Sequence, residues 1–127
     1  MSRPVMEPSV KHPITIEPTQ GRVVVRIGDT VVADSTHALT LQESTYPAVQ
    51  YIPMADVDQS LLRRTETATY CPFKGDASYY SVETPGGATV ADAIWTYEQP
   101  HAAVAEIKDH AAFYPDRAAL TVEPASA

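Results

Sequence analysis

Proline is the residue that most constrains the fold of this chain, because each proline removes a backbone N–H donor and disrupts any helix that would run through it. The chain contains 11 prolines among its 127 residues. They are spread from end to end, at positions 4, 8, 13, 18, 47, 53, 72, 85, 100, 115 and 124. Long helices are therefore not expected, and strands and turns must supply most of the structure.

The intervals between the prolines have the composition of β-strands. Two runs rich in β-branched residues, 21–27 and 30–35, flank Gly28-Asp29, and this pattern predicts a hairpin. Further extended segments are predicted at 37–41, 48–52, 65–70, 77–83, 88–97 and 120–122, with short helical turns at 54–62 and 100–107. Because no strand–helix–strand alternation occurs, the expected fold is mainly β: a single domain of twisted antiparallel sheets with one or two short helices.

The length and the two ends of the chain suggest one domain between tails. A chain of 127 residues fits a single hydrophobic core. Both ends mix proline, serine and charged residues without a period, so flexible tails are expected at 1–12 and 123–127. The folded domain is then expected to span 13–122.

The charge balance and the cysteine content exclude several classes of protein. Nine Lys and Arg against sixteen Asp and Glu give a net charge of −7, whereas nucleic acids and anionic membranes require clustered positive charge, so neither is expected as a partner. The sequence shows no membrane-spanning run and no signal-peptide pattern, so a cytoplasmic location is expected. The single cysteine, Cys71, excludes an internal disulfide and any zinc site with two or more thiolates. No metal site and no cofactor are expected.

Three short stretches hold most of the aromatic and reactive side chains. They are 71–80, which begins Cys71-Pro72-Phe73-Lys74-Gly75, then 93–100, which contains Trp95, and 112–115, which reads Ala112-Phe113-Tyr114-Pro115. Together with Val32-Ala33-Asp34-Ser35 and Tyr51-Ile52-Pro53, these motifs and their spacing resemble the domain of unknown function 427 family over about residues 20–120.

The resemblance implies a fold more than a function. It suggests a twisted β architecture of the β-tent type, related to methionine sulfoxide reductase B and to the ligand-binding domain of cereblon. Those relatives often hold zinc through paired Cys-x-x-Cys motifs, which this sequence lacks, so zinc does not carry over. The family has also been given a nucleotidyltransferase-like label, but the sequence contains neither a Gly-Ser nucleotide loop with a downstream Asp-x-Asp pair nor a P-loop.

Cys71 and Lys74 are the candidate catalytic residues. An ammonium group close to a thiol stabilises the thiolate, and Lys74 follows Cys71 by three residues in a loop turned by Pro72 and Gly75. A nucleophilic thiol also needs a base, for which His37, His101 and His110 are candidates. The alternative is a small buried apolar residue at the end of a strand, where free cysteines usually lie.

Lys74 and Gly75 lie in the same loop, and the sequence gives an expectation for each. Lys74 is expected either to contact an anionic ligand or to be a surface lysine that balances Asp76 or Glu98. Gly75 is expected to supply a backbone angle that other residues avoid.

The aromatic residues predict a pocket. Alternation along the strand places Ala93, Trp95 and Tyr97 on one face, opposite Ile94 and Thr96. Three more rings are expected to complete an aromatic wall suited to a flat or cationic ligand, namely Tyr51, Phe73 and Tyr79. Tyr79 is chosen over Tyr80 because the two point to opposite faces and Ala77, beside Tyr79, is small. The alternative is that Trp95 is simply the centre of the core.

These observations leave three functions open. The first is binding of a small molecule or a peptide end in a pocket formed by Tyr51, Cys71, Phe73, Lys74, Gly75, Tyr79, Trp95 and Tyr97. The second is an enzyme, using Cys71 as a nucleophile or redox group or acting as the nucleotidyltransferase-like label suggests. The third is an interaction module that forms a homodimer through exposed strand edges.

Overall fold

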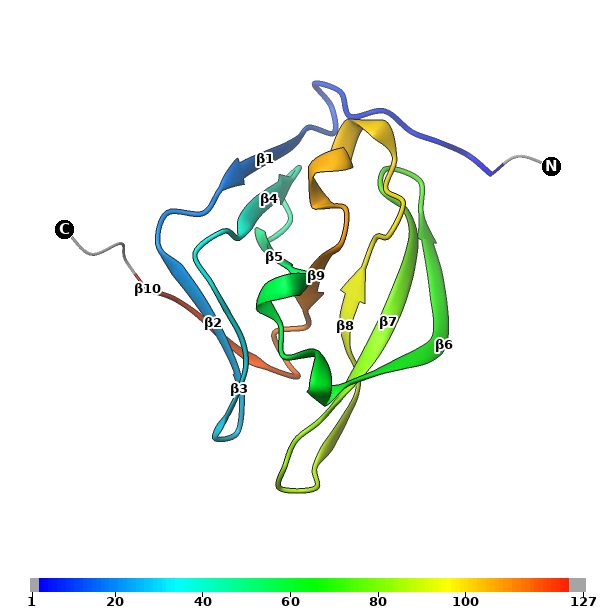
Figure 1. Cartoon of the computed structure of the whole chain (residues 1–127). Coiled ribbons are helices and arrows are strands. Elements are labelled where there is room, and N and C mark those ends of the chain that lie inside the picture. The colour runs from blue at the N-terminus through cyan, green and yellow to red at the C-terminus, as the bar shows by residue number, and fades with distance from the viewer. Residues whose placement is uncertain (1–2, 124–127) are drawn as a thin grey trace.

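The computed structural model of the protein describes residues 3–123, which form ten strands and three short 3₁₀ helices (Figure 1). The strands are β1 (Ile14–Pro18), β2 (Arg22–Ile27), β3 (Thr30–Ser35), β4 (Leu39–Glu43), β5 (Val49–Pro53), β6 (Leu62–Cys71), β7 (Gly75–Glu83), β8 (Thr89–Thr96), β9 (His110–Phe113) and β10 (Ala119–Glu123). The helices are η1 (Met54–Asp56), η2 (Gln59–Leu61) and η3 (Ala102–Ile107). Of the expected tails, residues 1–2 and 124–127 lie outside the described range.

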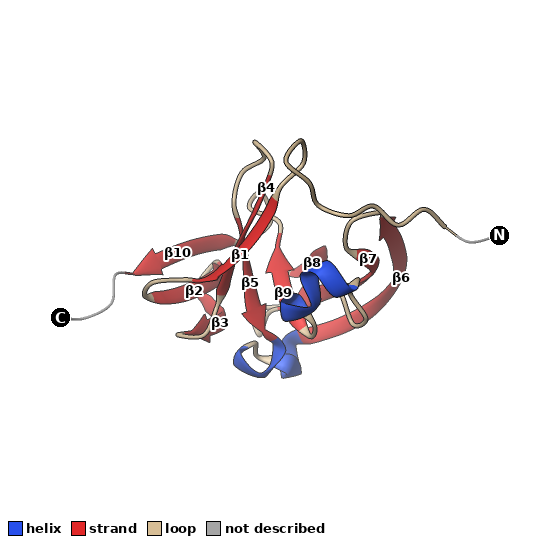
Figure 2. Cartoon of the chain, turned by 90° about the horizontal axis from the view of Figure 1, so that it is seen from above, coloured by secondary structure: helices blue, strands red, loops and turns tan. Residues whose placement is uncertain are grey.

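The strands form two antiparallel sheets, which confirms the predicted fold class. The larger sheet has seven strands in the order β1-β4-β5-β9-β8-β7-β6, and the smaller has three in the order β10-β2-β3. Figure 2 shows the smaller sheet on one side of the molecule and β6 to β8 on the other, with β5 and β9 between them. No helix in residues 3–123 is long and apolar enough to span a bilayer.

Two strands of the larger sheet had no firm counterpart in the sequence interpretation. β1 is an edge strand that pairs with β4 in the register Ile14↔Glu43, and its last residue, Pro18, is tolerated because an edge strand leaves one row of backbone donors unused. β9 follows η3 closely and pairs with both β5 and β8. The predicted helical turns are present, as single 3₁₀ turns at η1 and η2 and as the kinked η3.

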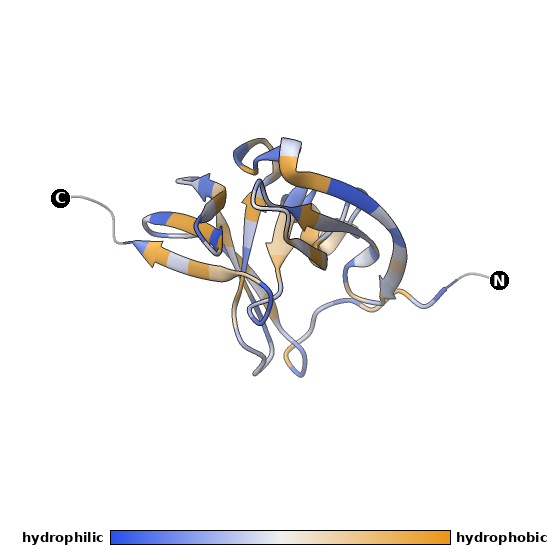
Figure 3. Ribbon diagram, turned by 90° about the horizontal axis from the view of Figure 1, so that it is seen from below, coloured by the Kyte–Doolittle hydropathy of each residue, from blue (hydrophilic) through white to orange (hydrophobic). Residues whose placement is uncertain are grey.

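The core is divided between the two faces of the larger sheet. One cluster fills the space toward the smaller sheet and includes Val25, Ile52 and Ile94, whereas the second includes Tyr51, Tyr79 and Tyr97. The division follows from the two-residue period of a strand, and Figure 3 shows apolar and hydrophilic residues alternating along the strands.

A bulge near Asp92 interrupts the regular pairing of β6, β7 and β8. Asp92 has a positive φ of 47°, and its carboxylate accepts hydrogen bonds from Thr65 and Thr67, each 2.7 Å long. The hydrogen bond from Thr65, followed by that from Thr67, lowers the pKa of Asp92. Register shifts in the β6–β7 and β7–β8 pairs accompany this irregularity. Such bulges increase the local twist of the strands.

The described part of the N-terminal segment, residues 3–12, lies against the turn between β6 and β7. The Met6 backbone N–H donates to the Pro72 carbonyl at 2.9 Å, and the Tyr70 hydroxyl donates to the Pro4 carbonyl at 2.5 Å. The Arg3 guanidinium lies 4.2 Å from the centroid of the Tyr70 ring. The segment therefore reaches the loop that the sequence marked as reactive.

Candidate functional site

A cavity of about 800 Å³ opens beside the second core cluster. Its walls come from β4, β5, β7 and β8, the loop 46–48, and the segment 113–120. The lining is predominantly apolar and aromatic, with seven rings contributed by Tyr46, Tyr51, Tyr79, Trp95, Tyr97, Phe113 and Tyr114. Its volume lies within the range of pockets that bind small molecules, about 300–1,000 Å³.

Trp95 lies in this wall and is only partly buried. β8 pairs with β7 so that Trp95 lies opposite Tyr79, and with β9 so that it lies opposite Ala112. Its indole N–H donates to the Tyr51 hydroxyl at 3.2 Å, and the Tyr114 ring lies tilted at 48° with a centroid distance of 4.5 Å. The indole is thus held on two sides while it also borders the cavity.

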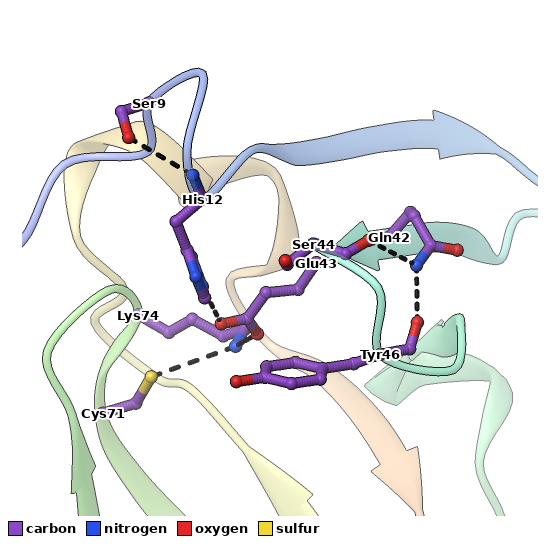
Figure 4. Close-up of polar contacts among 8 residues, drawn as sticks. All are labelled: Ser9, His12, Gln42, Glu43, Ser44, Tyr46, Cys71 and Lys74. Atoms are coloured by element: carbon purple, nitrogen blue, oxygen red, sulfur yellow. Dashed lines mark hydrogen bonds and ion pairs between the residues drawn. The ribbon is translucent and has the colours of Figure 1, made fainter.

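The lining of the cavity includes a buried ion pair between Lys74 and Glu43 (Figure 4). Lys74 is only 7% exposed, and its ammonium donates to Glu43. The second carboxylate oxygen of Glu43 lies 2.7 Å from His12 Nε2, and Cys71 Sγ lies 3.9 Å from Lys74 Nζ. The Tyr46 ring also lies beside this group in Figure 4. Lys74 is therefore not a surface lysine, which corrects one of the two interpretations of this residue.

The partners that the sequence suggested for Lys74 are engaged elsewhere. Asp76 pairs with Arg3, and Glu98 pairs with Arg64 at 2.8 Å. Glu43 takes their place because it is the last residue of β4 and lines the cavity beside Lys74, 31 residues further along the chain.

Two opposing effects set the ionisation of Glu43. Burial alone would raise its pKa, but the hydrogen bonds from Lys74 and His12, together with their charges, outweigh burial, so the pKa of Glu43 lies below its ordinary value. The group is a carboxylate at neutral pH and compensates the ammonium beside it.

Acid should weaken the protein through this group. Because the folded-state pKa of Glu43 is lowered, its stabilising contribution is complete above the unfolded-state pKa of about 4.3 and is lost as the pH falls through the folded-state pKa. We expect the free energy of unfolding of the wild type, relative to Glu43→Gln, to fall between about pH 6 and about pH 3. Urea unfolding at several pH values measures this difference. A constant difference across that range would show that the ion pair contributes no acid-sensitive stability.

Gly75 fixes the loop that carries Lys74. Its φ is +112°, and a Cβ atom added there would lie 3.3 Å from the Gln99 carbonyl oxygen and 3.6 Å from His101 Nδ1. Backbone hydrogen bonds of Lys74 also hold the loop. The Lys74 N–H donates to the Cys71 carbonyl, and the Lys74 carbonyl accepts from the His101 N–H. Both the backbone angle and the close approach require glycine at this position.

Substitution of Gly75 should therefore destabilise the domain. We expect Gly75→Ala to lower the free energy of unfolding by about 1–3 kcal/mol, because the added methyl group strains the backbone and presses on residues 99–101. Gly86→Ala is the matched control, since an added Cβ there meets nothing within 4 Å. Equal unfolding midpoints of the two variants in urea would rule out this role for Gly75.

The cavity brings together five of the eight residues that the sequence assigned to a pocket. Tyr51, Lys74, Tyr79, Trp95 and Tyr97 line it. The other three lie around it rather than in its lining. Phe73 stacks on the His12 ring at 4.1 Å, Gly75 shapes the loop, and Cys71 packs partly buried against the second core cluster.

The structure also shows on which face of the larger sheet Tyr80 and Ala93 lie. Tyr80 packs against the first core cluster, on the opposite face from Tyr79. Ala93 also belongs to the first cluster, together with Ile94, because the irregular backbone at Asp92 interrupts the alternation that would place it with Trp95.

None of the three histidines considered as bases for Cys71 hydrogen-bonds to its sulfur within residues 3–123. His101 bonds to Tyr70, His110 to the Lys108 carbonyl, and His37 to Thr36. Within residues 3–123, Lys74 is the only hydrogen-bonding neighbour of the Cys71 sulfur. The same part of the chain holds no group of three His, Cys, Asp or Glu side chains arranged to bind a metal ion.

Sequence reasoning missed Glu43, His12 and Tyr114 as members of the site. Tyr114 was part of a recognised motif, and its position in the segment that follows β9 brings it to Trp95. Glu43 and His12 carry no local signal, because each meets its partner across the fold.

The fold and the site define a small antiparallel β domain with an aromatic-walled cavity whose lining includes a buried ion pair. The chain belongs to the family described as Domain of unknown function (DUF427), whose model matches residues 15–124. This match confirms the resemblance seen in the sequence motifs. A search of the curated proteins finds no match to the chain.

Proposed function

We propose that this protein is a binding domain that takes a small molecule or a peptide end into the aromatic-walled cavity. The observation that carries the proposal is the cavity of about 800 Å³ beside Trp95, with Lys74 and Glu43 in its lining. Apolar walls with a few polar groups at defined positions are typical of ligand sites, where rings supply contact area and polar groups set orientation.

The shape of the wall favours a ligand with a flat apolar part. Trp95 and Tyr114 lie with their ring centroids 4.5 Å apart, and Tyr51 lies edge-on to Trp95. Rings in these orientations gain about 0.5–1.5 kcal/mol per aromatic pair beyond simple burial. A ligand ring entering the cavity would extend this arrangement.

Trp95 provides a direct test because it is the only tryptophan in the chain. We expect compounds from an aromatic fragment library to produce a saturable change in Trp95 fluorescence. Ala48→Phe, on the cavity rim, should weaken that change, whereas Ala105→Phe, on the exposed side of η3, should leave it intact. No saturable change with any compound, or an equal response in both variants, would contradict the proposal.

Catalysis by Cys71 is a second candidate, favoured by the 3.9 Å approach of the Lys74 ammonium to the thiol. Against it, Glu43 already compensates the ammonium, and Cys71 is partly buried. The rate at which iodoacetamide alkylates Cys71 at neutral pH distinguishes the enzyme from the binding domain. A rate well above that of glutathione would favour the enzyme, and a slower rate would favour the binding domain.

A further inference from the structure

The hydroxyl of Tyr97 is the unused polar group of the cavity. The three buried tyrosines of the described chain are Tyr51, Tyr79 and Tyr97. The Tyr51 hydroxyl accepts from Trp95 at 3.2 Å, and the Tyr79 hydroxyl bonds to Thr69 at 2.9 Å. Tyr97 is 94% buried, being only 6% exposed, and its hydroxyl has no hydrogen-bond partner within residues 3–123.

This hydroxyl faces the cavity rather than closed protein interior. Tyr97 is one of the lining residues, and no fully enclosed side-chain oxygen or nitrogen of residues 3–123 lacks a partner. The Tyr97 oxygen therefore retains access to the cavity space. A hydroxyl that faces the cavity without a protein partner can donate to an acceptor that enters the cavity, and this hydrogen bond adds to the affinity of such a ligand.

A second hydroxyl on the same wall also has a spare donor. The oxygen of Tyr51 accepts the indole N–H of Trp95, but no acceptor for its own proton exists within residues 3–123. Burial, followed by the proximity of Tyr51, Cys71, Tyr79 and Glu43, raises the pKa of Tyr97 above its ordinary value, so its proton is retained at neutral pH. Both phenols are therefore neutral groups able to donate.

The charges of the cavity are already compensated. Among residues 3–123, Lys74 and Glu43 are the only charged residues in its lining, and they pair with each other. The remaining carboxylate oxygen of Glu43 is engaged by His12. An ionised group placed against this lining would find no free counterion among residues 3–123, and removing an uncompensated charge from water is unfavourable.

We infer that the cavity selects an uncharged, ring-bearing small molecule whose carbonyl-type oxygen accepts a hydrogen bond from Tyr97. This inference rests on the proposed function and narrows it. A free peptide end is excluded as the preferred ligand, because an α-carboxyl or α-amino group is charged at neutral pH.

Four probes with one ring system and different polar groups test the inference: 2-naphthamide, 2-naphthoate, 2-naphthylmethylammonium and 2-methylnaphthalene. Binding is followed by the single indole N–H cross-peak of Trp95 in ¹H–¹⁵N spectra. We expect 2-naphthamide to bind at least about tenfold more tightly than either charged probe. Tyr97→Phe should weaken 2-naphthamide about five- to tenfold and leave 2-methylnaphthalene unchanged, as expected for one lost hydrogen bond.

Tyr80→Phe is the matched control, because it removes a hydroxyl from the opposite face of the same sheet. It should bind all four probes as the wild type does. Tighter binding of either charged probe, or an unchanged affinity of Tyr97→Phe for 2-naphthamide, would overturn the inference while leaving the binding function standing. Failure of all four probes to move the Trp95 cross-peak would overturn the inference and the proposed function together.

Discussion

Replacing Glu43 with alanine is expected to lower the free energy of unfolding by about 3 kcal/mol, through the loss of one carboxylate. The Lys74 side chain is only 9% exposed and its ammonium donates to Glu43, so the substitution leaves a buried charge without its partner. The same change releases His12 from its 2.7 Å contact. Urea unfolding followed by Trp95 fluorescence and far-UV circular dichroism measures the loss.

A double variant separates the unpaired charge from the lost packing. Glu43→Leu combined with Lys74→Met removes both charges while keeping similar volume, and such replacements of buried pairs are often close to neutral. We expect it to recover most of the stability lost in Glu43→Ala. Asp34→Ala, which breaks an exposed pair with Arg22, should have little effect. A double variant no more stable than Glu43→Ala would show that shape, and not charge, makes this position important.

The strands could be predicted where their signals are local. β2 and β3 are rich in β-branched residues and flank Gly28, whose φ of 58° suits the turn between them. The two-residue period also placed Tyr79 and Tyr80 on different faces without any knowledge of their partners. β1 escaped prediction because its five residues end in proline and gain their strand character from pairing with β4.

The site was only partly visible in the sequence, for physical reasons that differ between residues. The alternation that correctly separates Trp95 from Ile94 fails at Ala93, since no sequence period reveals the bulge at Asp92. Phe73 looked like a pocket wall, but the described N-terminal segment brings His12 to its ring. Long-range contacts of this kind depend on the complete fold, and motif reading alone does not supply them.

Neighbouring residues of β8 belong to different parts of the protein, one to the hydrophobic core and the next to the cavity wall. Ile94 is fully buried toward the smaller sheet, and the next residue, Trp95, lies in the cavity wall. Because neighbouring residues of β8 serve different faces, substitutions one position apart should have different consequences.

Ile94→Ala should therefore lower the free energy of unfolding by about 2–5 kcal/mol, since it opens a void in the core, while changing the affinity for a cavity ligand less than about twofold. Trp95→Leu should instead affect mainly the affinity for the ligand. It removes the largest ring of the wall and should weaken a bound aromatic probe by about 10- to 100-fold. Its effect on stability should be smaller than that of Ile94→Ala, because Trp95 is only partly buried.

Isothermal titration with 2-naphthamide gives both affinities without relying on Trp95 as the reporter, and urea unfolding followed by circular dichroism gives both stabilities. The contrast depends on the indole acting as a binding surface and not mainly as core. If Trp95→Leu loses as much stability as Ile94→Ala and still binds the probe with wild-type affinity, then the ring belongs to the core, and the ligand site must lie elsewhere.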